Sequence, residues 1–483
     1  MGLLGIVVGL ALLIWLAFRG WSILLLTPAA ALIAAAFSGQ PLLAHWTQTF
    51  MSAAAGFVAQ FFPLFLLGAL FGKLMEDSGS VTSIGRAMTE RLGKERAILA
   101  VVLAGAIVTY GGVSLFVSYF VLGPMAMTLF KSADIPRRLM PATIALGTST
   151  FTMTALPGTP AVQNAIPMPF FGTTPFAAPG LGIIASAIIL GFGLFWLDRA
   201  LARARVAGEG FGGEAAGTAG VADVPGLRER ATTSHEFDPT EIERGQRSED
   251  LPPIALAALP LVAVIVVNLL MSFVILPRLD LSYLAEPQWG PTSLSHVGGV
   301  WSVVIALTVA ILMVIAINFR RLPAIRATID AGANASVLPI ISVASLVGFG
   351  AVVAALPAFA VVRDWVLSIG GGPLVSLAVA INVLSALTGS ASGGMTIALD
   401  SLGATYMQLA ATYGIDPSLL HRVAVVSAGT LDTLPHNGAV VTLLAVCGTT
   451  HRESYRDIVM VAIVGAIIAL VAIVVLGSIF GSF

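Results

Sequence analysis

The sequence predicts an all-α polytopic membrane protein, an inverted-repeat transporter with two re-entrant hairpins, two broken helices and about ten full spans. Composition gives the first reason. Hydrophobic residues make up 57% of the chain and charged residues 10%, and the mean hydropathy is +0.96. A chain of 483 residues with so little polar surface cannot cover a soluble fold of that size, so its solvent must be lipid.

A faint internal repeat gives the second reason. Positions in and around breaks of apolar segments recur about 276 to 278 residues later in the chain. Gly56, Pro63 and Gly72 return as Gly332, Pro339 and Gly348, and Leu156, Pro157, Ala161 and Val162 return as Leu434, Pro435, Ala439 and Val440. The same helix breaks were therefore built twice, and paired broken helices indicate the binding site of a secondary transporter.

Charge and cysteine content narrow the partners. A net charge of −1 argues against nucleic acid, because phosphate binding needs clustered Lys and Arg. The single cysteine, Cys447, excludes an internal disulfide and a cysteine-based metal cluster. We expect neither a metal nor a cofactor. The first apolar run, residues 3–18, lacks a basic leader and a small-residue cleavage site, so we interpret it as a retained helix.

Basic residues set the predicted orientation in the membrane. They gather in four segments between apolar runs: Lys73, Arg86, Arg91, Lys94 and Arg96; Lys131, Arg137 and Arg138; Arg199, Arg203 and Arg205; and Arg320, Arg321 and Arg326. By the positive-inside rule these segments are cytoplasmic. Both termini then lie outside, and the protein is expected to be a multi-pass protein of the inner (cytoplasmic) membrane.

Five parts follow from this orientation. Residues 1–50 form two spanning helices, and residues 51–198 form the first repeat, with a hairpin at 97–130 and a broken helix at 139–171. Residues 199–251 are expected to be a flexible cytoplasmic linker, because most of this segment is polar and rich in Gly, Glu and Arg. Most of it should be dispensable for transport. Residues 252–325 form two more spans, and residues 326–483 form the second repeat, with a hairpin at 372–412 and a broken helix at 418–449. The first repeat begins outside and the second begins in the cytoplasm, so the repeats are inverted.

The four breaks predict an anion site. Backbone that is interrupted at membrane depth leaves N–H and C=O groups that lipid cannot satisfy, so it must line a wet cavity or a ligand. Half-helix N-termini carry a partial positive charge and suit a carboxylate. Small hydroxyls, amides and glycines cluster at these breaks, although Ser and Thr also serve as packing contacts between membrane helices. The predicted substrate-binding residues are Tyr110, Gly111, Gly112, Ser114, Thr154, Gly158, Thr159, Asn164, Ser390, Ser392, Gly393, Thr433 and Asn437. Gln163 is a weaker candidate.

Asp432 and His436 are the predicted proton-coupling residues. They lie four residues apart around Pro435, in a segment otherwise free of charge. An ionisable group at membrane depth is costly and suggests function by default. A structural ion pair that holds the break is the alternative, and Asp400 is a lesser candidate. His421, Arg422, His451 and Arg452 are interpreted as topology anchors near helix ends.

The sequences at the breaks carry a family resemblance. With Leu156-Pro157-Gly158-Thr159-Pro160 and Leu434-Pro435-His436-Asn437-Gly438 at the breaks, and Tyr110-Gly111-Gly112 and Gly389-Ser390-Ala391-Ser392 at the tips, the chain resembles the gluconate permease (GntP) family of the ion-transporter superfamily. It looks most similar to the branch for short hydroxy acids such as 3-hydroxybutyrate. The resemblance implies proton-coupled uptake of a small organic anion, a homodimer and an elevator mechanism. The first break lacks the His of that family, which disfavours a sugar acid.

The expected function is therefore proton-coupled symport of a short hydroxy or keto monocarboxylate, with the lipid bilayer and the organic anion as partners. One alternative is a Na⁺-coupled carboxylate symporter. A remote alternative is an intramembrane serine hydrolase that uses Ser390 or Ser392 with His436 and Asp432, since such triads occur in any chain order. The inverted duplication counts against an enzyme, and a passive channel gives the buried acid no role.

Overall fold

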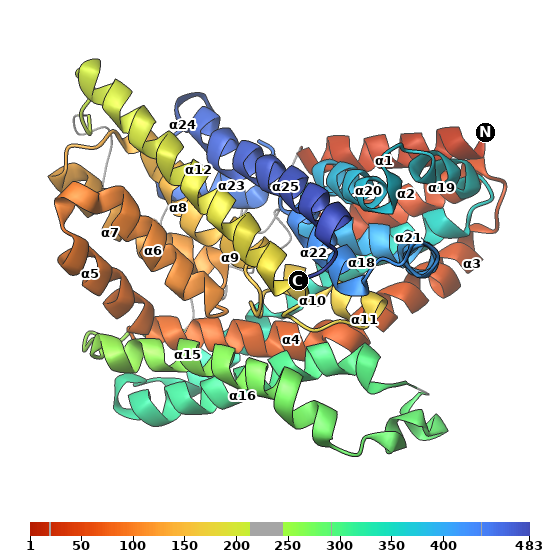
Figure 1. Cartoon of the computed structure of the whole chain (residues 1–483), viewed down its shortest axis with the longest axis horizontal. Helices are drawn as coiled ribbons and strands as arrows, with labels where there is room; N and C mark the ends of the chain where they lie inside the picture. The colour runs from red at the N-terminus through yellow and green to blue at the C-terminus, as the bar shows by residue number, and fades with distance from the viewer. Residues whose placement is uncertain (19–20, 213–244, 291, 436) are drawn as a thin grey trace.

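A computed structural model describes residues 1–18, 21–212, 245–290, 292–435 and 437–483, and every regular element in these ranges is helical (Figure 1). Seven helical segments there are long and apolar enough to cross a membrane. They are Leu42–Asp77, Leu115–Ser132, Pro179–Val206, Ile254–Arg278, Leu294–Arg321, Ile325–Ala355 and His451–Phe480. Three shorter apolar helices, Gly2–Leu13, Ile23–Phe37 and Gly372–Thr388, accompany them. The predicted all-α polytopic class is confirmed.

Each half of the chain contributes one series of helices. The first series is α1 (Gly2–Phe18), α2 (Ile23–Phe37), α3 (Leu42–Ala44), α4 (Met51–Asp77), α5 (Ser80–Leu92), α6 (Ala97–Tyr110), α7 (Leu115–Ser132), α8 (Met140–Thr148), α9 (Phe151–Thr154), α10 (Val162–Ala165), α11 (Pro167–Phe171) and α12 (Pro179–Val206). The second is α15 (Ile254–Leu270), α16 (Leu294–Asn318), α17 (Ile325–Ala335), α18 (Val337–Ala355), α19 (Phe359–Leu367), α20 (Gly372–Thr388), α21 (Ala391–Tyr413), α22 (Pro417–Ala428), α23 (Gly438–Val446), α24 (His451–Ile458) and α25 (Gly465–Phe480).

Both predicted hairpins are present as pairs of packed helices. Helices α6 and α7 pack on each other across a turn at 111–114, where Gly112 has a φ of +103°. Helices α20 and α21 pack on each other across a shorter turn, where Gly389 has a φ of +65°. This left-handed backbone favours glycine, which explains why Gly stands at both tips.

Both predicted broken helices are also present. Helix α8 stops at Thr148, and after the single turn of α9 the chain is non-helical over 155–161 before α10 begins. Helix α22 stops at Ala428, and α23 begins at Gly438 after the second break. Pro157 and Pro160 in the first break and Pro435 in the second lack a backbone N–H, so an unbroken helix could not continue through them.

The two halves interlock. Helices α1 and α2 pair, as do α15 and α16, and each pair packs on the long helix of the other half: α2 on α18 and α16 on α4. Helices α4 and α18 pack on each other, and so do α12 and α25. The short helices α5 and α19, which precede the two hairpins, lie at opposite ends of the molecule (Figure 1). This arrangement is the one expected of inverted repeats.

Three sequence-based expectations change with the fold. Helix α12 runs to Val206, so the first part of the predicted linker 199–251 is helical, while residues 213–244 lie outside the described residues. Arg422 is fully buried, and so is His421, so neither is an anchor at the membrane surface. The Arg422 guanidinium donates to the carbonyl oxygens of Ala155 and Ala177, at distances of 2.6 to 3.1 Å. Ala155 lies in the first break and Ala177 in the non-helical segment before α12, so both carbonyls need donors from elsewhere in the chain.

We predict that Arg422→Met destabilises the protein by about 3 kcal/mol, because it strands two buried carbonyls that accept from the guanidinium. Thermal unfolding in detergent should show a clear drop in Tm. The control is Arg452→Met, since Arg452 is exposed and should leave the Tm unchanged. Equal Tm values for the two variants would contradict a structural role for Arg422.

Candidate functional site

A cavity of about 150 Å³ lies where the first hairpin tip, the first break and the long helices meet. Its walls come from five regions far apart in the chain. They are Gly112 to Phe116 at the tip and start of α7; Met153 and Pro160 to Gln163 at the break; Leu64, Phe65, Gly68 and Ala69 of α4; Ala335, Ser336, Pro339 and Val343 of α17 and α18; and Ser392 of α21. Thr109 of α6 completes the lining. Both halves of the chain therefore build this large cavity.

The large cavity is neutral but suited to an anion. No charged side chain lines it among the residues that the structure describes. Two long helices begin at its edge: α7, capped by Ser114 accepting from the Phe116 N–H at 3.3 Å, and α21, capped by Ser390 accepting from the Gly393 N–H at 3.2 Å. Their N-terminal partial charges favour negative charge in the space between them. Ser336 and Ser392 also line the cavity; the Ser336 hydroxyl donates to the Ala333 carbonyl, and that of Ser392 lies 3.2 Å from the Ser390 hydroxyl.

Gln163 is the polar residue best placed for a ligand. Its side chain is 7% exposed, and its Oε1 atom has no hydrogen-bond partner among the described residues. A buried amide oxygen without a partner costs free energy unless a ligand or water satisfies it. The amide lines the large cavity and also a smaller one beside it. Gln163 therefore lies between the two cavities and lines both of them.

The small cavity, of about 30 Å³, lies beside the second break. It is lined by Asp432, Thr433 and Asn437 from that break and by Tyr119, Ser149 and Thr154 from the first half. It shares Leu115, Met153 and Gln163 with the large cavity. Asp432 is thus a carboxyl group next to, but outside, the space that suits an anion.

Asn437 organises this region. Its Oδ1 accepts from the N–H groups of Ala439 (2.6 Å) and Val440 (3.2 Å), which caps α23. Its Nδ2 donates to the Gly389 carbonyl at 2.8 Å, which ties the start of α23 to the tip of the second hairpin. One amide therefore holds two of the four breaks together.

Eight of the predicted substrate or coupling residues lie at or beside the cavities. Gly112, Ser114 and Ser392 line the large cavity, and Thr154, Asp432, Thr433 and Asn437 line the small one. The Ser390 hydroxyl lies 3.2 Å from that of Ser392 and caps α21. His436 lies outside the described residues, so its predicted pairing with Asp432 is not described. Asp400, the lesser candidate, is exposed on α21.

Six other predicted substrate-binding residues line neither cavity, and they contact backbone groups or packed side chains. Tyr110 donates from its hydroxyl to the Pro157 carbonyl at 2.7 Å, and Asn164 donates from Nδ2 to the carbonyls of Thr159 and Pro175. Thr159 accepts from the Ala161 N–H through its own hydroxyl. The three glycines, Gly111, Gly158 and Gly393, pack against Leu261, Phe176 and Leu346 respectively. These groups satisfy the broken backbone or allow close packing.

Sequence analysis missed the apolar walls. Phe65, Gly68, Ala69 and Val343 come from helices that looked like ordinary spans. One signal could have found them: Pro63 and Pro339 are a repeated pair, and Pro339 itself lines the cavity. Sequence analysis also ranked Asn164 above Gln163. The structure reverses that order, because Asn164 is fully used by backbone carbonyls and by His421.

Comparisons with known proteins assign the family. Residues 10–286, more than half of the chain, match the family described as CitMHS, citrate transporter. The chain belongs to the CitMHS family. It is 40% identical over 484 aligned residues to the uncharacterized transporter YxjC of Bacillus subtilis (strain 168), with 98% of each chain covered. A shorter match, 32% identical over 95 residues, joins it to an uncharacterized transporter of Haemophilus influenzae and covers 20% of this chain and 22% of the relative.

Among solved structures, the fold is similar to that of the Alcanivorax borkumensis YdaH transporter, whose crystal structure is described as having an unusual topology. The TM-score is 0.54 at 17% identity, covering 91% of this chain and 88% of that one. This likeness concerns the fold alone. Together with the family match, it makes the CitMHS protein a multi-pass membrane transporter.

The predicted membership of the gluconate permease family is wrong. The family match places the chain in the CitMHS family instead. The physical reason is that Gly, Pro, Ser and Thr at hairpin tips and helix breaks are demanded by interrupted backbone, whatever the substrate. Such motifs identify this class of architecture and do not separate its families.

We predict that Asn437→Ala lowers stability by about 1 to 2 kcal/mol, because it removes the cap of α23 and its tie to Gly389. The matched control is Asn334→Ala, since Asn334 is exposed and donates only to a carbonyl of its own helix, that of Asp330. Thermal unfolding of both variants in detergent measures the difference. A Tm for Asn437→Ala equal to that of Asn334→Ala would rule out the organising role.

Proposed function

We propose that this CitMHS protein is a secondary active transporter that carries a small hydroxylated organic anion together with a coupling cation across the inner membrane. This proposal is supported by two adjoining cavities at the hairpin tips and helix breaks. One cavity is neutral and bordered by helix N-termini, and the other is lined by Asp432. Adjacent sites for an anion and a cation give a simple basis for coupling, because each bound charge stabilises the other.

The lining favours a substrate of low net charge. Helix N-termini contribute about half a unit charge each, and no Lys or Arg faces the large cavity among the described residues. A short hydroxy or keto monocarboxylate meets this condition directly. The family description makes citrate the first compound to test. Citrate carries several negative charges at neutral pH, so it would enter such a site with its charge reduced by protons or by a bound cation.

The coupling ion is proposed to bind at the small cavity. Asp432 is its charged group, and His436 remains the second proposed proton-coupling residue. One observation favours the Na⁺ alternative: the Thr433 hydroxyl is 6% exposed and lacks a hydrogen-bond partner among the described residues. A hydroxyl oxygen and a carboxylate are ligands that suit a hard cation. Uptake with sodium removed at fixed pH separates the two ions.

Other expectations have less support. The homodimer and the elevator mechanism were implied by the gluconate permease resemblance, which the family match replaces, so the proposal depends on neither. The orientation with both termini outside remains a prediction from charge alone. The remote hydrolase alternative is disfavoured because the relatives are transporters and the Ser390 hydroxyl is used as a helix cap.

A ligand screen on purified protein tests the proposed function. Citrate with and without Mg²⁺, short hydroxy and keto monocarboxylates, and their methyl esters are compared by thermal shift. Binding stabilises the folded state by mass action, so the substrate should raise the Tm and its ester should not, because the helix dipoles act on the charge. Equal shifts by acid and ester would contradict the anion site.

We predict that Gln163→Leu weakens binding of the acid found in this screen by about tenfold or more, since a buried amide that meets a ligand is replaced by an apolar side chain. The matched control is Gln408→Leu, because Gln408 is exposed on α21. Calorimetry on both variants measures the affinity. Wild-type affinity in Gln163→Leu would remove Gln163 from the site.

We also predict that Asp432→Asn abolishes gradient-driven accumulation while substrate binding persists, because the substitution keeps the shape of the side chain and removes its charge. Uptake into proteoliposomes with an imposed proton or sodium gradient measures accumulation. Asp400→Asn is the control, since Asp400 is exposed. Gradient-driven accumulation at the wild-type level in Asp432→Asn would show that the coupling ion binds elsewhere.

A further inference from the structure

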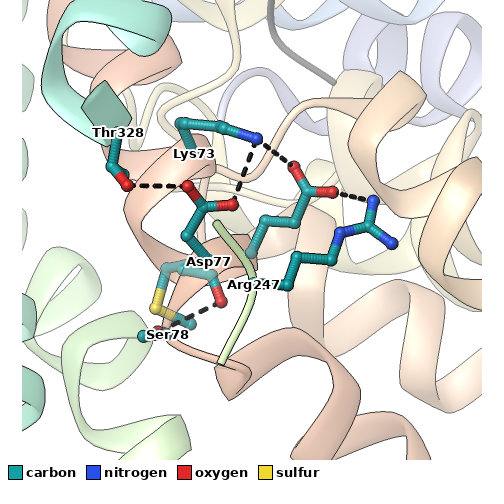
Figure 2. A network of polar contacts seen from close by, with 7 residues as sticks. Lys73, Asp77, Ser78, Arg247 and Thr328 are labelled. Carbon is teal, nitrogen blue, oxygen red and sulfur yellow. Dashed lines mark hydrogen bonds and ion pairs between the residues drawn. The ribbon is translucent and has the colours of Figure 1, made fainter. Parts of the chain in front are cut away.

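A buried charge cluster lies at the end of α4, outside both cavities. Lys73 is 1%, Glu76 2% and Asp77 0% exposed. The Lys73 ammonium lies 3.4 Å from Glu76 Oε2 and 3.1 Å from Asp77 Oδ1. Thr328 of α17 donates from its hydroxyl to the other oxygen of Asp77 at 2.7 Å (Figure 2). Sequence analysis had taken Lys73 as a topology signal only.

The end of the connector between the two halves closes this cluster. We call residues 245–252 the strap. Arg247 pairs with the Glu76 carboxylate (Figure 2), and the Ser248 N–H donates to the Asp77 backbone carbonyl at 2.8 Å. Gly245 has a φ of +99°, and a Cβ there would lie 2.1 Å from Asp77 Oδ2. Only glycine fits so close, so the strap is shaped for this place.

The strap also reaches past the end of α4. Ser83 of α5 donates to the Pro252 carbonyl at 2.6 Å, and Leu251 packs over Gly79. Asp250 pairs with Arg321, just after α16, at 3.0 Å. Residues 78–79 are the turn that joins α4 to α5, and Gly79 has a φ of +75°. The strap therefore bridges both sides of a glycine turn.

This turn separates two parts of the proposed substrate site. Helix α4 supplies one wall of the large cavity, and α5 packs on α6 and α7, whose tip supplies another. Movement of the hairpin relative to α4 about Gly79 would change the shape of the cavity. The strap, attached to Glu76 and Asp77 on one side and Ser83 on the other, would have to leave first.

One cation of the charge cluster, Lys73, would stay in place if the strap left. With Arg247 bound, two cations face two carboxylates. Without it, the Lys73 ammonium remains within reach of both Glu76 and Asp77, so Glu76 keeps a counter-ion. The Arg247 side chain is 52% exposed and that of Glu76 is 1% exposed, so this ion pair joins a solvent-facing guanidinium to a buried carboxylate. The contact between Asp77 and Thr328 does not involve the strap. A released strap would therefore leave Lys73 beside both carboxylates and Thr328 on Asp77, which lowers the cost of release.

We propose that the strap is a detachable lock: residues 245–252 hold α5 against the end of α4 in the arrangement described here, and they release when the first hairpin moves relative to α4. Its role in the transport cycle rests on the proposed function, whereas its detachment does not. The proposed lock begins at Gly245, so a deletion in the connector that leaves transport intact should end before Gly245.

Chemical labelling tests detachment without any transport assay. Ser83 is 8% exposed beneath Pro252, and the native Cys447 is buried. In a Cys447→Ser background, Ser83→Cys should react slowly with a maleimide, and adding Arg247→Ala should raise the rate about tenfold by populating the released state. The control is Arg363→Ala, since Arg363 pairs with Asp364 on α19, at the opposite end of the molecule from α5 (Figure 1). Equal labelling rates with and without Arg247 would overturn the lock.

A disulfide tests the functional role. A Cβ on Gly79 would lie 2.9 Å from the Leu251 side chain and 3.8 Å from its Cα, which is close enough for Gly79→Cys and Leu251→Cys to pair. Uptake should fall about tenfold or more on oxidation and return on reduction, while each single-cysteine variant stays insensitive. Unchanged uptake in the oxidised double variant would overturn the role in transport. If the wild-type protein takes up no acid, the proposed function fails, and the labelling result still decides detachment.

Discussion

The structure depends on one constraint: a polypeptide broken inside an apolar environment must find partners for the backbone groups that each break releases. Part of that demand is met by buried side chains reaching across the halves, with Arg422 of the second half holding the carbonyls of Ala155 and Ala177 in the first. Asn437 and Tyr110 donate to break or tip carbonyls within their own halves, those of Gly389 and Pro157. What remains uncovered faces the two cavities, where a ligand can complete it.

The two breaks divide this work unequally. The first is held by a dense set of backbone contacts through Asn164, which in turn meets His421 from the second half. The second leaves the Thr433 hydroxyl without a hydrogen-bond partner among the described residues and places Asp432 at the small cavity. A rigid break beside a less satisfied one suits a site in which one side positions the substrate and the other responds to an ion. The strap adds a further contact, because it attaches the connector to α4, the helix that forms one wall of the large cavity.

Sequence patterns predicted the helical class, the hairpins and the breaks because hydropathy and repeated Gly and Pro are local consequences of lipid as solvent. Hairpins and breaks were found at the expected segments. The site was predicted less well, because the sequence alone does not separate Asn164 from Gln163, or Gly158 from Gly112. Only packing shows that Gln163 and Gly112 line the large cavity and that Asn164 and Gly158 do not. The family was predicted wrongly because the residue types at the breaks are required by the interrupted backbone and do not depend on the substrate. The buried Lys73 cluster could not be foreseen, since its strap comes from residues about 170 positions away in a segment that composition marks as unstructured.

The central claim is that an organic anion is held in the large cavity between the two hairpin tips. A crystal structure with a bromine-substituted analogue of the acid found by the ligand screen tests it most directly, because anomalous scattering locates the bromine without prior assumptions. The account predicts a bromine peak in the cavity bordered by Ser114, Gln163 and Ser392. A peak at any other place in the molecule, with that cavity empty of the acid, would contradict it.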